Sequence, residues 1–184
     1  MIFSAPAQRC YFRALIGLML MAFWPRAVHA QMAVPSATGG SRSGVYVLAD
    51  AGKPNYRNDS LLGATAGAYI QGRPWLGFDG QLIALRWGPS EEHQYFALAG
   101  PRFAWNRGRW TAIGTAEAGI GHARYNEGTD SSYGFSWMLT GGLDMQLNYR
   151  FKWRVAQFSY GGIDVLDNGL NPKIISSGIV FRLF

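Results

Sequence analysis

The sequence contains few of the residues on which disulfide-linked and metal-binding proteins depend. Its 184 residues include one cysteine, three histidines and 15% charged residues, where an average soluble chain carries about 25%. The cysteine, Cys10, precedes the first apolar run and is lost if the leader is removed. Disulfide and thiol chemistry are therefore not expected. Beyond residue 30, no apolar run approaches the roughly 20 residues that a membrane-spanning helix needs.

Motifs for cofactors and nucleic acid are also missing. No His/Cys cluster has metal-ligand spacing, and the glycines of Gly119–Gly121 lack the third glycine and the helix of a phosphate-binding loop. The formal net charge of +6 falls to +3 once the three arginines of residues 1–30 are removed. Such a weak and scattered charge does not indicate nucleic-acid binding. We therefore predict no metal, no cofactor and no nucleic-acid partner.

Residues 1–30 have the pattern of a cleaved signal peptide. Arg9 and Arg13 precede an apolar run, and Val28 and Ala30 have the small-x-small spacing that signal peptidase recognises. The alternative is a membrane anchor, but the run is only about half as long as a helical span. We predict export with cleavage after Ala30. Residues 31–43 are small, polar and contain Pro and Gly, which is typical of a flexible N-terminal segment.

The remainder, 44–184, repeatedly alternates apolar and polar residues with a period of two, which indicates half-buried strands. In one stretch Phe135, Trp137 and Leu139 alternate with Ser136 and other polar or small residues. Eight such strands are predicted: 44–52, 61–71, 75–86, 94–105, 110–122, 134–147, 152–163 and 174–184.

The connections between these segments alternate between short and long. The second, fourth and sixth are tight, whereas the other four are longer and more polar. In an antiparallel meander, alternate connections lie at the same end, so one end has short turns and the other has long loops. This asymmetry is typical of outer-membrane barrels.

Aromatic residues gather beside the short connections. They are Trp75, Trp105, Trp110, Tyr149, Phe151 and Trp153. Aromatic girdles lie where a barrel wall meets lipid headgroups. The alternative is a lipocalin-like barrel or a sandwich with core aromatics. The fold class that we predict is an all-β, eight-stranded, antiparallel, up-and-down transmembrane barrel.

The last strand carries a further pattern. A polar-x-Gly-x-x-hydrophobic-x-hydrophobic arrangement is formed by Ser176, Gly178, Phe181 and Leu183, with Phe184 as the terminal aromatic. In these features residues 44–184 resemble the eight-stranded, OmpA-like outer-membrane β-barrel family. The resemblance implies an outer membrane of the Gram-negative type, the outer-membrane assembly machinery, lipid and lipopolysaccharide as partners, and a monomer.

The polar face of the predicted strands should line the lumen. It places Asp79, Arg102, Glu117, Asp144 and Arg182 inside a cylinder barely wide enough for side chains. Buried charges persist only when paired, so we predict a salt-bridge network in which Arg102 and Arg182 pair with the carboxylates. A side-chain-filled lumen is favoured over an open pore at this strand number.

The sequence does not favour an enzyme. Some small outer-membrane barrels modify lipid A with a His, a Ser and a carboxylate on the wall, and His122 is the candidate here. It is followed by Ala123 and Arg124, with no Ser two residues on, and a lone His lacks the nucleophile it would activate. We expect a structural or surface-exposed protein with an adhesive role for the loops. The alternatives are a small porin-like pore and a lipid A-modifying enzyme.

Overall fold

The computed structural model describes residues 42–53, 60–86, 93–125, 130–164 and 171–183. The predicted signal peptide and residues 31–41 lie outside the described residues, as does Phe184. The described part forms eight strands: β1 (Arg42–Lys53), β2 (Leu61–Gln71), β3 (Leu76–Arg86), β4 (His93–Arg107), β5 (Trp110–Tyr125), β6 (Asp130–Gln146), β7 (Phe151–Asp164) and β8 (Lys173–Arg182). No helix in these ranges is long and apolar enough to cross a membrane.

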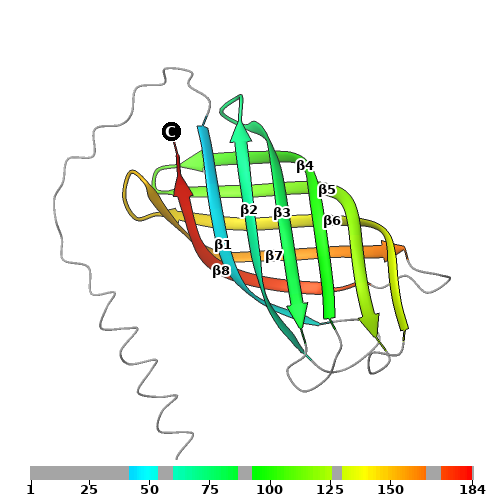
Figure 1. The fold of residues 1–184 in the computed structure, drawn as a ribbon. Helices are drawn as coiled ribbons and strands as arrows, with labels where there is room; N and C mark the ends of the chain where they lie inside the picture. Colours follow the sequence, from blue (N-terminus) through cyan, green and yellow to red (C-terminus); the bar gives the residue numbers. More distant parts are fainter. Residues whose placement is uncertain (1–41, 54–59, 87–92, 126–129, 165–170, 184) are drawn as a thin grey trace, which may run out of the picture. The chain divides into compact units, whose positions relative to one another are not determined.

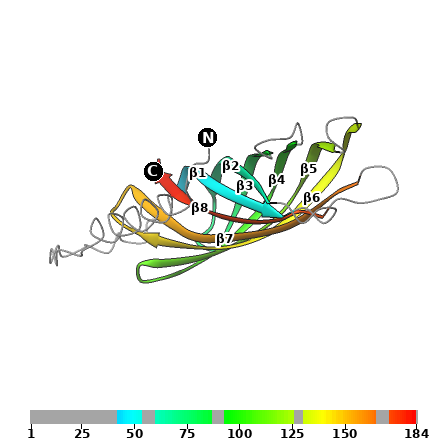
Figure 2. The same ribbon diagram turned by 90° about the horizontal axis from the view of Figure 1, so that it is seen from below.

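The strands close into a barrel in which each pairs antiparallel with the next along the chain (Figures 1 and 2). Strand β1 also pairs with β8, from Gly44 opposite Arg182 to Lys53 opposite Lys173. These findings confirm the predicted fold class. The first strand begins two residues earlier than predicted, at Arg42, and the amide of Leu183 donates to the carbonyl of Ser43 at 2.9 Å.

The tight connections lie together at one end of the barrel, as predicted from the alternation. They follow β2, β4 and β6 and end at residues 75, 109 and 150. Gly108 lies between β4 and β5 with a φ of 60°. Residues that carry a Cβ rarely adopt this left-handed backbone conformation. At the β6–β7 turn, the Asn148 carboxamide oxygen accepts hydrogen bonds from the amides of Arg150 and Phe151.

Strand side chains alternate between the lumen and the outer wall. Large apolar residues are exposed on the wall, among them Val47, Leu82 and Ile120 at 63% each. The polar residues of the opposite parity are buried inside. Because the wall is apolar and the lumen polar, the pattern is inverted relative to a soluble barrel.

One strand departs from strict alternation. Between β6 and β7 the register shifts: Asp144 faces Arg154, whereas the preceding Leu143 faces Ala156, so Val155 is the extra residue of a bulge. A bulge moves the residues on either side of it onto one face. Arg154 and Gln157 consequently both point inward, although their separation of three residues would put them on opposite faces of a regular strand.

The lumen is not polar along its whole length. Near the long connections it is filled by an apolar cluster, in which Phe96, Leu85 and Met138 are buried. The complete cluster comprises Leu61, Ile83, Leu85, Phe96, Leu98, Ala123, Met138, Ile163 and Ile174. Buried polar residues such as Asp50 and Gln94 also lie in this half, so the apolar cluster interrupts the polar lining of the lumen and does not replace it.

Candidate functional site: the polar network in the lumen

Two arginines and two aspartates form ion pairs across the lumen, in the half of the barrel nearer the short turns. Arg102 on β4 contacts Asp79 on β3, with 2.9 Å between Nη1 and Oδ2. Its Nη2 lies 3.8 Å from Oδ2 of Asp144 on β6. Arg154 on β7 approaches the same carboxylate, with 2.7 Å between Nε and Oδ1. Both arginines are only 1% exposed, so the paired charges occupy the interior and do not line a wide channel.

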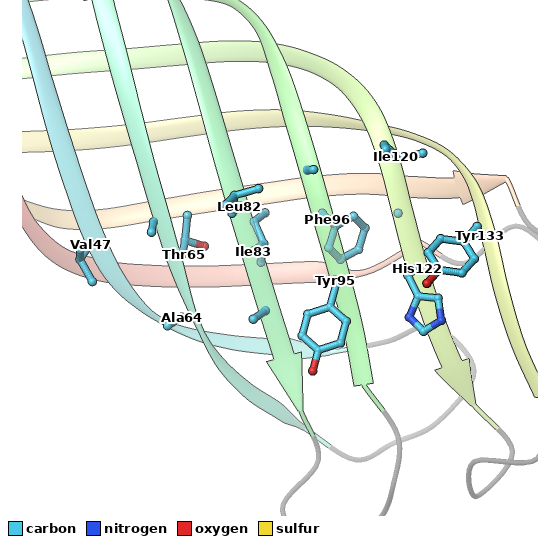
Figure 3. A pocket seen from close by; sticks show the side chains of 14 residues that line it. Val47, Ala64, Thr65, Leu82, Ile83, Tyr95, Phe96, Ile120, His122 and Tyr133 are labelled. Atoms are coloured by element: carbon cyan, nitrogen blue, oxygen red, sulfur yellow. The ribbon is translucent and has the colours of Figure 1, made fainter.

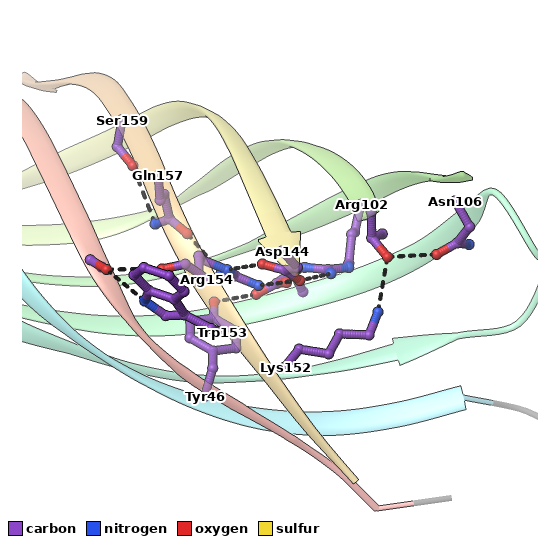
Figure 4. Close-up of polar contacts among 12 residues, drawn as sticks. Tyr46, Arg102, Asn106, Asp144, Lys152, Trp153, Arg154, Gln157 and Ser159 are labelled. Carbon is purple, nitrogen blue, oxygen red and sulfur yellow. Dashed lines mark hydrogen bonds and ion pairs between the residues drawn. The ribbon is translucent and has the colours of Figure 1, made fainter. Parts of the chain in front are cut away.

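Neutral side chains extend this network toward other strands (Figure 4). The Tyr46 hydroxyl on β1 donates to Asp79 Oδ1 at 2.5 Å. Arg154 Nη1 donates to the Gln157 carboxamide oxygen at 2.7 Å, and Gln157 Nε2 lies 3.5 Å from the Ser159 hydroxyl. These hydrogen bonds satisfy several of the remaining donors and acceptors, which lowers the cost of burying the ion pairs, although Arg102 Nε has no hydrogen-bond partner among the described residues.

Two tyrosine rings cover the guanidinium groups. Arg154 lies 4.5 Å from the centre of the Tyr46 ring, and Arg102 lies 4.2 Å from that of Tyr69. Both distances are within the range of cation–π attraction. Together with the ion pairs, these contacts join β1, β2, β3, β4, β6 and β7, so the network ties the barrel together across its diameter.

Further polar contacts lie in the lumen on either side of the ion pairs, along the barrel axis. Toward the short-turn end, Lys152 Nζ donates to the Thr111 hydroxyl at 3.1 Å, and that hydroxyl donates to Asn106 at 2.7 Å. Elsewhere in the lumen Thr65 donates to Asp50 at 2.6 Å. The lumen thus contains a series of local polar contacts on either side of the central ion pairs.

The predicted site residues do not all join the ion-pair network. Asp79, Arg102 and Asp144 come together in it. Glu117 is buried and accepts a hydrogen bond from Gln81, but it forms no ion pair with the residues that the structure describes. Arg182 is partly exposed near the end of β8.

The position expected for Arg182 in the network is taken by Arg154, which the sequence pattern missed. Alternation with a period of two assigns Gln157 to the lumen and therefore Arg154 to the wall. The bulge at Val155 reverses that assignment. No signal in the sequence marks this bulge, since neither glycine nor proline accompanies it.

The residues of the predicted assembly signal lie along the pairing of β8 with β1. Ser176 is buried opposite Asp50, and Gly178 faces Leu48. Phe181 lies on the outer wall, where its ring centre is 5.1 Å from that of Phe151. Leu183 is exposed beyond the strand.

The second candidate location, around His122, lies on the outer wall and not in the lumen. Its ring centre is 4.3 Å from that of Tyr133 and 5.4 Å from that of His93. Tyr95 is the next ring, at 6.3 Å. The described residues contain no group of three or more His, Cys, Asp or Glu suited to a metal ion.

No known family model matches the sequence, and no curated protein is significantly similar to it. Solved structures share the fold. Neisserial surface protein A superposes with a TM-score of 0.60 at 10% identity, over 77% of this chain and 96% of that one. Ail, the attachment invasion locus protein of Yersinia pestis, solved with the heparin analogue sucrose octasulfate, gives 0.54 at 19% identity, over 78% and 97%.

A third structure is the N-terminal barrel domain of Pseudomonas aeruginosa OprF. It superposes with a TM-score of 0.53 at 11% identity, over 78% of this chain and 100% of that domain. The likeness to these outer-membrane barrels lies in the fold, and the share of each neighbour that is covered shows that the whole barrel is matched.

Proposed function

We propose that the protein is a small, monomeric outer-membrane barrel with a closed lumen, and that it acts as a structural, surface-exposed protein whose long connections are available for attachment. The observation that carries this proposal is the filled lumen. The ion pairs of Arg102 and Arg154 cross the half nearer the short turns, and the apolar cluster around Phe96 and Met138 fills the half nearer the long connections. Such an interior suits a scaffold better than a channel.

The outer wall supports the membrane location. Its middle is apolar, with aliphatic and small residues and a few aromatic ones such as Phe158, and further exposed aromatic residues lie near both ends. Trp75, Trp105 and Tyr149 are at the short-turn end, whereas Tyr95 and Tyr133 are at the other. Two aromatic bands around an apolar middle match the two interfaces of a bilayer.

Attachment is supported by the shape of the protein and by one neighbour. The strand ends that the four long connections join lie at one end of the barrel, which is where outer-membrane barrels expose their loops to the exterior. Ail, which shares the fold, is named as an attachment invasion locus protein. A pore is less well supported because buried side chains occupy the lumen.

A lipid A-modifying enzyme is also less well supported. The ring neighbours of His122 are Tyr133, His93 and Tyr95. A nucleophilic mechanism needs a hydroxyl or thiol activated by a base within hydrogen-bonding reach, with a third group that orients the base. The contacts of His122 among the described residues are those of a packed aromatic cluster.

The location and orientation can be tested in cells. We expect the protein in the outer-membrane fraction with Gln31 at its N-terminus, because Val28 and Ala30 precede the predicted cleavage site. An epitope inserted at 126–129 should be labelled by antibody on intact cells. The control is the same epitope in the short turn at Gly108, which should be labelled only after lysis. An intact Met1, or labelling of both sites on intact cells, would contradict the proposal.

The closed lumen can be tested by electrical recording. Purified protein in planar bilayers should show no large, steady conductance, because Arg102, Asp144 and Arg154 lie within the lumen with almost no exposure. A porin of known conductance, reconstituted in parallel, shows that insertion is detected. A stable open channel from the unmodified protein would instead favour the pore.

A further inference from the structure

We propose that the outer wall of strands β2 to β5, near the long connections, binds a phosphate-bearing lipid of the outer leaflet. In this arrangement Arg86 and Arg124 bind the phosphate, and an acyl chain lies in a groove below them. The inference rests on the proposed placement in the outer membrane and adds a specific lipid site to it.

The groove is formed where the wall carries small side chains. Ala66 and Ala97, together with Leu82, line two adjoining depressions of about 460 and 660 Å³. Larger side chains flank the depression of about 460 Å³, which is the one nearer the long connections, with Val47 on one side and Ile120 on the other (Figure 3). The result is a pair of adjoining depressions with a mainly apolar lining, which suits a hydrocarbon chain.

Strand register aligns this groove with cations. At the outer ends of three neighbouring strands, Arg86 is the partner of His93, and His93 is the partner of Arg124. All three belong to the faces of their strands that point outward, and Arg86 is exposed. The Cα atoms of the two arginines are therefore about 10 Å apart across two strand spacings. Two long side chains at this separation can contact one phosphate between them.

Aromatic residues fill the next level of the wall. Tyr95, His122 and Tyr133 are register partners across β4, β5 and β6. They lie one level closer to the middle of the barrel than the cations. Figure 3 shows their rings beside one another near the ends of these strands. Amphipathic rings favour the depth at which headgroup meets acyl chain. The wall thus changes from cationic to amphipathic to apolar in the order that a lipid molecule presents.

The length of the groove fits one leaflet. From Arg86 the apolar surface continues along β3 to Gly80, whose register partners are Ala68 and Ala99. Six residues of strand cover about 20 Å. With the strand tilt of a transmembrane barrel, this corresponds to a depth of about 15 Å, half the thickness of a hydrocarbon core.

Charge complementarity decides the occupant. On the outward face at this end the described cations are Lys53, Arg86, Arg124 and Lys173, and the described acid is Asp164. Guanidinium groups bind phosphate through paired hydrogen bonds. A second copy of this chain would present the same cations at the same depth, and like charges would oppose its docking. An anionic lipid has both the charge and the chain that the surface requires.

The test uses native mass spectrometry of the refolded protein in detergent with three probes. These are a phosphatidic acid with 14-carbon chains, the diacylglycerol with the same chains, and inorganic phosphate. We expect adducts with phosphatidic acid at least tenfold more readily than with either other probe. The Arg86→Gln/Arg124→Gln variant should lose about tenfold or more in affinity, because charged hydrogen bonds to the phosphate are removed. Ala97→Trp should block the groove and reduce binding similarly.

Matched controls separate this site from general effects. Arg107→Gln/Arg109→Gln removes two exposed arginines from the opposite end, and Ala156→Trp places the same bulk on the outer wall of β7. Both should bind phosphatidic acid like the unmodified protein. All variants are first checked for heat-modifiable migration, which reports barrel folding.

Several results would overturn the inference. Equal binding of phosphatidic acid and diacylglycerol would show that the arginines do not recognise the phosphate. Adducts with inorganic phosphate alone would show that the groove does not bind an acyl chain. A dimer that dissociates on Ala97→Trp, with lipid binding unchanged, would identify a protein interface instead. A protein found in the outer membrane without conductance, yet without lipid preference, would leave the proposed function standing and reject this site alone.

Discussion

Replacing Arg154 with methionine is expected to lower the free energy of unfolding of the barrel by about 3–5 kcal/mol, because it leaves a buried carboxylate without its nearest partner. Arg154 Nε lies 2.7 Å from Asp144, and both residues are almost fully buried. The other arginine near this carboxylate, Arg102, is 3.8 Å away and is already paired with Asp79. Arg102 contacts Asp79 through Nη1 and Asp144 through Nη2, so in the variant Asp144 keeps only the longer of its two ion pairs.

The measurement is urea unfolding of protein refolded into detergent or lipid, followed by tryptophan fluorescence. Arg182→Met is the matched control, since it removes a partly exposed arginine from the end of β8. It should change the free energy of unfolding by about 1 kcal/mol or less. Equal effects of the two substitutions would show that the central ion pair has no special role in stability.

A double-mutant cycle measures the pair itself. Adding Asp144→Leu to Arg154→Met removes both charges, and an apolar replacement of a buried pair is often close to neutral. The double variant should therefore be more stable than the sum of the single effects implies, by about 1–3 kcal/mol. Strictly additive effects would mean that the two side chains contribute independently.

Replacing Gly178 with alanine is expected to prevent closure of the barrel. A Cβ at this position would lie 2.7 Å from the Cα of Leu48 and closer still to the carbonyl of Val47, both in the backbone of β1. A backbone cannot move aside as a flexible side chain can. Separation of β1 from β8 would leave backbone hydrogen-bonding groups unpaired, at a cost of several kcal/mol each within a membrane.

The comparison is with Gly141→Ala, in the middle of β6, where an added Cβ meets nothing within 4 Å. That variant should refold with normal heat-modifiable migration, whereas Gly178→Ala should not. Because the purified protein is refolded in the absence of assembly factors, a failure of Gly178→Ala alone is caused by packing and not by loss of a recognition signal. Normal refolding in vitro with defective assembly in cells would instead assign Gly178 to that signal.

The sequence by itself determined the number of strands, their approximate bounds and the two ends of the barrel. Each of these is a local property. Residues such as Phe135 and Trp137 alternate with Ser136 and Thr140 because neighbouring side chains on a strand point to opposite faces. The alternating lengths of the connections then required an antiparallel meander, and its closure follows because a free strand edge is unstable in lipid.

The partners inside the lumen could not be read in the same way. Arg102, Asp144 and Arg154 meet from strands β4, β6 and β7, and such contacts depend on register and on barrel closure. The alternation failed for Arg154 because one extra residue at Val155 reverses the faces of the strand. A bulge of this kind arises from pairing with β6 and β8, which is a property of the sheet and not of the segment.

The apolar half of the lumen and the groove on the wall were decided by tertiary structure for the same reason. Leu85 and Met138 have inward parity in their own strands, but only closure of the barrel brings such residues together as a core. Ala66, Leu82, Ala97 and Ile120 come from four neighbouring strands, and strand register alone places them in one row on the wall. Alternation fixes the side of the wall on which a residue lies, while register fixes its neighbours and therefore the chemistry of each site.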